Sequence, residues 1–296
     1  MANYSMWVLE YSYVADYHLS GIVYGAHNQG YRKLPYCYAL IKGDDGVAMV
    51  DVGYNHKEYG KYLADKFGVK NWHSPRHVLA KCDVAPEDVQ KVFITHAHFD
   101  HFGNVGDFPN ATFYVQEEEF SKWLWVMSLP QRMQWMMGAV DPADLIRATE
   151  LARDGRLVLV NGDMENVMPG VDLYAAADTH TYGSQYVRVR NDGVNPSSDS
   201  WVFAGDLIYV YENLQGSEDM VGRKDAYIPV GLAVGSQTNL VLTTERMMGM
   251  VGHDVKRIVP VHEERLREAF PSRIGEDGLR VTEICLADGA RSCVAA

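Results

Sequence analysis

Apolar runs of strand length alternate along the chain with longer segments of helical character. The first clear feature is a hairpin, in which YCYALIK (36–42) leads through GDDG (43–46) into VAMVDVG (47–53). A Gly/Asp cluster between two β-rich runs is typical of a tight turn between paired strands. Further short apolar runs predict strands at 91–95, 111–116, 156–160, 171–177, 184–190, 200–205 and 256–261. Helical patterns occur at 56–68, 117–127, 141–155, 242–252 and 263–270, with a short helical turn at 85–88.

Strands therefore occur early, in the middle and late in the sequence, with helices between them. This order predicts an α/β or α+β fold. The 296 residues are 47% hydrophobic and 22% charged, which is an ordinary globular balance and is enough to bury a large core. No linker or low-complexity tract interrupts the pattern, so we expect one domain over residues 1–296.

The net charge of the chain argues against two classes of binding partner. The chain has 27 Lys and Arg against 39 Asp and Glu, a net charge of −12. Binding to nucleic acids or to anionic membranes requires concentrated positive charge, so neither partner is expected. No apolar run reaches the length of a membrane span, and Glu10 and Asp16 interrupt the N-terminal segment, so neither a transmembrane helix nor a secretory signal is expected.

The cysteines point to a reducing compartment. Four of them, Cys37, Cys82, Cys285 and Cys293, form no CxxC pair, and we expect free thiols in a cytoplasmic protein. A Cys285–Cys293 disulfide is the alternative.

The segment with the clearest chemistry directly follows the strand predicted at 91–95. His96, His98, Asp100 and His101 stand within six residues, and alternation on an extended backbone points the first two histidines to the same side. Three further candidates also come at strand ends, namely His180, Asp206 and His262. Imidazole and carboxylate groups are the ligands that zinc and similar metals take, so the set predicts a metal site.

This pattern, with HAHFDH (96–101) at its centre, resembles the metallo-β-lactamase superfamily from MVDVG (49–53) through VPVH (259–262). The resemblance implies an αββα sandwich of two mixed sheets with helices outside. It also implies two zinc ions, with manganese, iron or cobalt as replacements. One ion would be held by His96, His98 and His180, the second by Asp100, His101 and His262, and Asp206 would bridge them. Asp51 either orients a ligand imidazole or is a plain turn aspartate.

The chemistry implied is hydrolysis, in which a metal-bridging hydroxide attacks a carbonyl or phosphoryl centre. Tyr209, three residues after Asp206, is similar to a substrate-contacting tyrosine of the N-acyl homoserine lactonase branch. We therefore expect a lactone or similar cyclic carbonyl compound as the small-molecule substrate, with Asp100 and Tyr209 as catalytic residues. Tyr211 is a competitor for the role of Tyr209. The alternatives are a cyclic amide, a thioester or a phosphodiester, and an iron-dependent oxygenase reaction on the same fold.

Two segments, 117–155 and 207–240, are interpreted as pocket-forming insertions. The Trp- and Met-rich stretch 120–138 suits an adaptable apolar pocket, although at least half of its large side chains are expected to pack the core. Tyr24 and His27, in a glycine-rich loop, could reach the metals. Five other histidines have no motif around them and are interpreted as non-functional: His18, His56, His73, His77 and His253. A homodimer is a candidate assembly, but the sequence does not name the oligomer.

Overall fold

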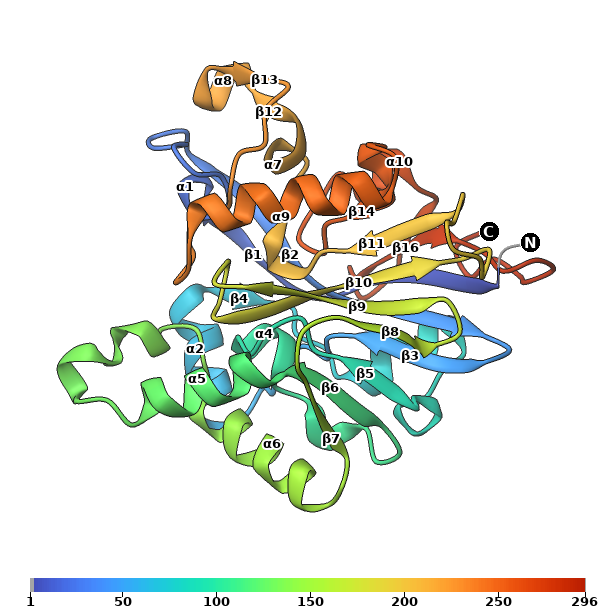
Figure 1. The fold of residues 1–296 in the computed structure, drawn as a ribbon, viewed down its shortest axis with the longest axis horizontal. Helices are drawn as coiled ribbons and strands as arrows, with labels where there is room; N and C mark the ends of the chain where they lie inside the picture. Colours follow the sequence, from blue (N-terminus) through green and yellow to red (C-terminus); the bar gives the residue numbers. More distant parts are fainter. Residues whose placement is uncertain (1–2, 296) are drawn as a thin grey trace.

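The computed structural model describes residues 3–295, in which two β-sheets lie face to face with helices on both outer sides (Figure 1). The larger sheet has nine strands: β1 (Tyr4–His18), β2 (Tyr31–Gly43), β3 (Gly46–Val50), β4 (Val69–Lys70), β5 (Lys91–Phe93), β6 (Thr112–Gln116), β7 (Leu157–Val160), β15 (Ser272–Ile274) and β16 (Arg280–Cys285). The smaller has five: β8 (Met164–Met168), β9 (Val171–Ala177), β10 (Gly183–Arg190), β11 (Ser200–Phe203) and β14 (Ile258–Val259). A separate two-stranded ribbon joins β12 (Gly216–Ser217) to β13 (Arg223–Lys224).

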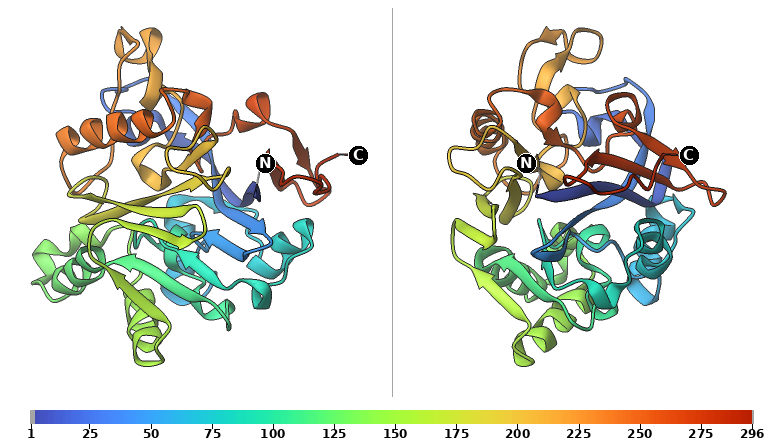
Figure 2. Two further views of the ribbon diagram at one scale, coloured as in Figure 1. Left: turned by 45° about the vertical axis from the view of Figure 1, so that its right-hand side comes forward. Right: turned by 90° about the vertical axis from the view of Figure 1, so that its right-hand side faces the viewer.

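Both large sheets are mixed. In the larger one the order is β15-β16-β1-β2-β3-β5-β6-β7, with β4 paired to β1. The pairs from β15 to β3 are antiparallel, whereas β3, β5, β6 and β7 run parallel. The smaller sheet is antiparallel except that β11 and β14 are parallel. Figure 2 shows the C-terminal strands beside the N-terminal one, at one edge of the sandwich.

Helices cover both outer faces. In Figure 1, α9 lies over the five-stranded sheet, and α2, α5 and α6 lie beyond the nine-stranded sheet. The α-helices are α1 (Leu19–Ile22), α2 (Glu58–Phe67), α3 (Pro75–Leu79), α4 (Phe99–Phe102), α5 (Glu117–Met127), α6 (Pro142–Arg153), α7 (Glu212–Gln215), α8 (Glu218–Val221), α9 (Gln237–Met250) and α10 (Leu266–Ala269). The 3₁₀ helices are η1 (Ala80–Cys82), η2 (Pro86–Asp88), η3 (Val105–Asp107), η4 (Gln131–Met137), η5 (Gly205–Leu207) and η6 (Val255–Arg257). The expected αββα sandwich is confirmed.

The central strands are apolar on both faces because each face packs against a different layer. On β2, Ala39 and Ile41 belong to the core between the two sheets, whereas Tyr38 and Leu40 belong to the core under the helices. Side chains alternate across a strand, so a strand buried on both faces is continuously apolar. The run YCYALI (36–41) is therefore a strand buried on both faces.

The longest strand, β1, is not among those that the sequence pattern predicts. Its charged Glu10 is buried, and the Lys33 ammonium lies 2.8 Å from the Glu10 carboxylate, with the Arg280 guanidinium at 3.8 Å. The partners come from β2 and β16, which pair with β1 on either side. A buried carboxylate is tolerated when it is paired in this way.

Most predicted elements are present with shifted ends. Strand β14 is only two residues long, because η6 takes up the start of the predicted strand at 256–261. Helix α9 begins five residues before its predicted start, where the Ser236 hydroxyl caps it by accepting from the backbone N–H of Asn239. No helix of the described residues is long and apolar enough to cross a membrane.

Candidate metal centre

All candidate ligands lie at one edge of the sandwich, after the carboxyl ends of its strands. His96 and His98 follow β5, and His180 follows β9. Asp206 lies in η5 after β11, and His262 follows β14. Rigid strands thus position side chains that stand on loops.

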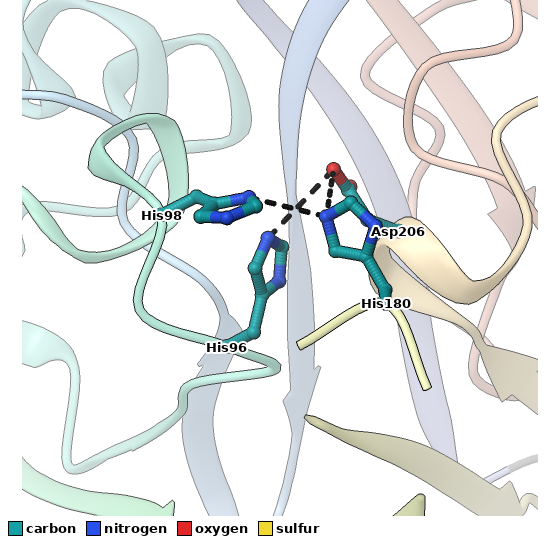
Figure 3. Close-up of side chains that lie close together, drawn as sticks. All are labelled: His96, His98, His180 and Asp206. Atoms are coloured by element: carbon teal, nitrogen blue, oxygen red, sulfur yellow. Dashed lines mark hydrogen bonds and ion pairs between the residues drawn. The ribbon is translucent and has the colours of Figure 1, made fainter. Parts of the chain in front are cut away.

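Four of these side chains form one group, shown in Figure 3. The Nδ1 atom of His98 lies 3.1 Å from Nε2 of His180. The Oδ2 atom of Asp206 lies 3.4 Å from Nε2 of His180 and 3.7 Å from Nε2 of His96. Three imidazole nitrogens and one carboxylate oxygen therefore converge on one point.

A second group lies on the other side of the same carboxylate. It consists of Asp100, His101 and His262. The Oδ1 atom of Asp206 is 3.1 Å from Nε2 of His101 and 3.0 Å from Nε2 of His262. Each oxygen of Asp206 thus faces a different group.

The donor atoms fit metal ions. Within residues 3–295, the Nε2 atoms of His96 and His101 are buried and make no hydrogen bond. The Nδ1 atom of His180 donates to the carbonyl of Leu232 at 3.0 Å, and that of His262 donates to the carbonyl of Pro35 at 2.7 Å. Because a carbonyl can only accept, Nδ1 carries the proton when either ring is neutral, and the lone pair of Nε2 is then directed into the site.

The Asp51 carboxylate lies next to the second group and orients one of its imidazoles, which is one of the two roles considered for it from the sequence. Its Oδ2 atom lies 2.8 Å from Nδ1 of His101 and also accepts from the Thr95 hydroxyl at 2.8 Å, while its Oδ1 atom accepts from the Thr95 backbone N–H. The Thr95 oxygen in turn lies 3.0 Å from Nδ1 of His96. One carboxylate therefore orients rings of both groups.

We expect the Asp51→Ala variant to lose about 10- to 100-fold in activity or metal affinity, which is the usual cost of removing a group behind a ligand. The reason is that the His101 imidazole stays in the site but loses the partner that fixes its ring. A zinc titration followed by kcat/KM measurement checks this. An unchanged titration curve would leave Asp51 as a plain turn residue.

Charge states differ between the two groups. Burial, followed by neighbouring imidazoles, lowers the pKa of His96 and His98 well below the usual value. Burial lowers the pKa of His180 to about 4. Burial also opposes charge on His101, but the surrounding carboxylates outweigh it and raise the pKa of His101 well above its usual value. The first group therefore presents neutral imidazoles at neutral pH.

Glu119 joins the two loops that carry the first group. This carboxylate of α5 is fully buried and accepts four hydrogen bonds, from the backbone N–H groups of Ala97 and Gly183, the Thr181 hydroxyl and the Trp123 indole, at 2.7–2.8 Å. Ala97 lies between His96 and His98, and Thr181 follows His180. No motif in the sequence marks Glu119 as part of the site.

The Glu119→Ala variant is expected to lower the free energy of unfolding by about 3 kcal/mol, because four buried donors lose their acceptor. Denaturant unfolding of the zinc-loaded protein measures this. Glu118→Ala is the matched control, since Glu118 is the exposed neighbour on the same helix. Equal stability of the two variants would contradict the anchoring role.

A mainly apolar pocket of about 300 Å³ opens onto the centre. It is lined by His98, Asp100, His180 and Asp206, and Tyr209 lies among them, 6% exposed. The Tyr209 ring is stacked on His262 with centroids 5.0 Å apart.

Tyr211 does not line this pocket. Its backbone N–H donates to Glu263, and its ring lies beside the Arg265 guanidinium. Residues 209–215 turn into α7 instead of continuing as an extended strand, so the two tyrosines do not share a face.

Both segments interpreted as insertions contribute to the lining. From 117–155 come Trp135, Met136 and the adjoining residues 138–139, and from 207–240 come Tyr209 and residues 232–234. The other large side chains of 120–138 do not line it: Trp123 and Met137 are buried in the core, and Trp125 is half exposed.

The pocket also contains residues that sequence reasoning missed. Tyr17 and Tyr36, from the paired strands β1 and β2, line it together with Phe99. A register irregularity between Val14 and Tyr17 precedes the point where β1 reaches the pocket. No local sequence signal marks these tyrosines among the 18 of the chain.

The glycine-rich loop does not reach the centre. Tyr24 is 54% exposed, and neither it nor His27 lines the pocket. A third group of potential ligands, His73, His77 and Asp277, lies elsewhere. There the Lys81 ammonium is 2.6 Å from the Asp277 carboxylate and already supplies a positive charge.

Known proteins are similar to this chain in sequence and in fold. An N-acyl homoserine lactonase of Bacillus thuringiensis is 24% identical over 250 residues, which span 81% of this chain and 86% of the relative. A crystal structure of a B. thuringiensis lactonase mutant with N-decanoyl-L-homoserine bound superimposes with a TM-score of 0.62 at 19% identity, covering 91% of this chain and 97% of that one. The dizinc lactonase AidC superimposes with a TM-score of 0.62 at 15% identity, covering 94% of both chains.

The family assignment rests on a match over most of the sequence. The sequence model of the metallo-β-lactamase superfamily matches residues 34–270, which include every candidate ligand. This chain is therefore a metal-dependent hydrolase that belongs to the metallo-β-lactamase superfamily.

Proposed function

We propose that this protein is a dinuclear metal-dependent hydrolase that opens a lactone or a similar cyclic carbonyl compound. The observation that carries the proposal is Asp206, whose Oδ2 faces His96 and His180 while its Oδ1 faces His101 and His262. This arrangement supports one carboxylate shared by two ions. With His98 and Asp100 the set has seven side chains, which is more than one tetrahedral site can use.

Zinc is the proposed metal, with manganese, iron or cobalt as replacements, because imidazole and carboxylate ligands suit all four. When bound, two such ions supply an activated water and a Lewis acid for the substrate carbonyl. Neutral His96, His98 and His180 would hold one ion. The second would be held by Asp100, His101 and His262.

Tyr209 supports a substrate whose leaving group is an oxygen. Burial, followed by the charge of Asp206, raises the pKa of Tyr209 well above its usual value, so its phenol keeps its proton at neutral pH. A protonated phenol beside His262 and Asp206 could donate to the oxygen on which charge develops as a ring opens. Asp100 faces the same pocket and is proposed to take up a proton in the reaction. The lactonase relatives support the same substrate class.

The lining of the pocket supports a substrate with an apolar group. Aromatic side chains from five different elements surround the polar centre: Tyr17, Tyr36, Phe67, Phe99 and Trp135. A pocket lined in this way binds the apolar part of a substrate, and a few polar groups fix the orientation of the substrate.

Metal analysis combined with hydrolysis assays tests the proposal. The purified protein should contain about two ions per chain. Acid release should be fastest with lactones when lactones, cyclic amides, thioesters and phosphodiesters of matched size are compared. Full activity with a single tightly bound ion would contradict the dinuclear site, and turnover of one of the other classes alone would contradict the lactone.

A further inference from the structure

Two thiols that are far apart in the sequence meet at the edge of the fold. Cys82 ends η1, and Cys293 lies in the segment that follows β16. Their sulfur atoms are 3.4 Å apart, although 211 positions separate the residues. We propose that Cys82 and Cys293 form a redox-sensitive disulfide, a modification site that fastens the C-terminal segment to η1.

Few hydrogen bonds hold the end of this segment in place. Among residues 3–295, the backbone N–H of Ala290 donates to Ala287, and those of Val294 and Ala295 donate to the Ser292 hydroxyl. All three bonds are internal to the segment. Among the described residues, hydrogen bonds tie this segment to the rest of the chain at two points: at its start, where the Ala287 backbone N–H donates to the Ser5 hydroxyl at 2.9 Å, and at Cys293, whose sulfur contacts that of Cys82. Cys293 and Val294 also pack against the core.

The geometry is close to that of a disulfide. A sulfur–sulfur bond is about 2.0 Å long, so the atoms must approach by little more than 1 Å. The segment that carries Cys293 is held by few bonds and can supply that movement.

The other two cysteines have different surroundings. The Cys285 sulfur lies 3.4 Å from the carbonyl of Tyr4 and 3.5 Å from the Asn191 amide, and Cys37 is buried in β2 between the sheets. The alternative Cys285–Cys293 pairing is therefore not supported. Cys285 instead provides a matched control.

The difference in solvent exposure between the two thiols determines which of them is oxidised first. Cys82 is 4% exposed, whereas Cys293 is only partly buried, so an oxidant such as hydrogen peroxide reaches Cys293 first. A hydrogen bond from the Cys82 thiol also lowers the pKa of Cys293, which favours its thiolate.

The thiolate of Cys293 attacks one peroxide oxygen, the O–O bond breaks, and the released hydroxide takes up a proton to leave as water. The product is a sulfenic acid. The Cys82 sulfur then attacks the sulfenic sulfur and loses its proton, and a second water leaves. Two thiols thus lose two electrons, and one hydrogen peroxide is reduced to two waters.

Non-reducing peptide mapping of the full-length, zinc-loaded protein tests the proposal. After stoichiometric hydrogen peroxide we expect two of the four thiols to disappear and one intramolecular peptide to join Cys82 to Cys293. Because the bond closes a very long loop, the thermal midpoint should rise by about 5 °C or more relative to the dithiothreitol-treated protein. The Cys285→Ser variant should behave like the wild type.

The Cys293→Ser variant should lose both the cross-linked peptide and the rise in midpoint. It tests the proposal even if Cys82→Ser fails to fold, because residue 293 is only partly buried. Four remaining thiols after peroxide treatment would overturn the proposal. So would a bond to a different cysteine or a cross-link between two chains.

Discussion

Replacing Asp206 by alanine is expected to abolish turnover and to release most of the bound metal. Its carboxylate is buried, and its two oxygens lie 3.0–3.7 Å from imidazole nitrogens of both ligand groups. Both proposed ions would lose the same anionic ligand. The loss of activity should therefore exceed the ~100-fold expected when a group behind a ligand is removed, as in Asp51→Ala.

Metal content and kcat/KM should be measured on the same preparations across a zinc titration. Asp206→Asn is the informative second variant, because it keeps the size of the side chain and one carbonyl oxygen but removes the charge. It should retain more metal than Asp206→Ala and still be nearly inactive. Wild-type metal content and rate in either variant would contradict the bridging assignment.

The positions of the candidate ligands could be predicted because they follow recognisable strands. KVFIT, VDLYAAA, SWVFAG and KRIVPV each predicted a strand, and His96, His180, Asp206 and His262 come at or shortly after their ends. In the fold these ends meet at one edge. The local pattern of an apolar strand followed by His or Asp therefore predicted residues that lie together although they are far apart in the sequence.

The residues that line the pocket could not be predicted, because their positions depend on the pairing of strands that are far apart in the sequence. Tyr17 reaches the pocket on β1, a strand whose buried Glu10 is stabilised by Lys33 and Arg280 from its two neighbours. Arg280 is 270 positions away in the sequence. Without those partners, an acidic residue in an apolar run reads as an interruption.

The Trp- and Met-rich stretch shows a similar limit. Trp123 is buried in the core, and its indole N–H donates to Glu119, one helical turn earlier on α5. Trp135 lies beyond the end of that helix, in η4, and is 79% exposed at the pocket. Both residues are tryptophans, and they differ in position: Trp123 lies within α5, whereas Trp135 lies after the helix has ended at Met127. Composition alone predicts an apolar region but not which tryptophan faces the pocket.

Tyr209→Phe is expected to keep the fold and both metals while slowing the reaction by about 10²- to 10³-fold, as for the loss of a general acid or an oxyanion donor. The phenylalanine ring can still stack on His262, so only the hydroxyl is lost. The loss should appear mainly in kcat, if the hydrogen bond strengthens as charge develops on the leaving oxygen. Substrates with better leaving groups should be less affected.

Tyr211→Phe is the matched control. Its hydroxyl is buried without a hydrogen-bond partner among the described residues, and its ring lies beside Arg265 outside the pocket. Removing an unpaired buried hydroxyl should leave stability and rate nearly unchanged. Steady-state kinetics on a lactone series, with metal content measured in parallel, separates the two roles. If Tyr211→Phe is slow and Tyr209→Phe is normal, the proton donor is Tyr211 instead of Tyr209. If both variants have normal rates, no phenol takes part in the mechanism. The case for a lactone is then weaker, since the proposed hydrolysis would depend on the metal ligands alone.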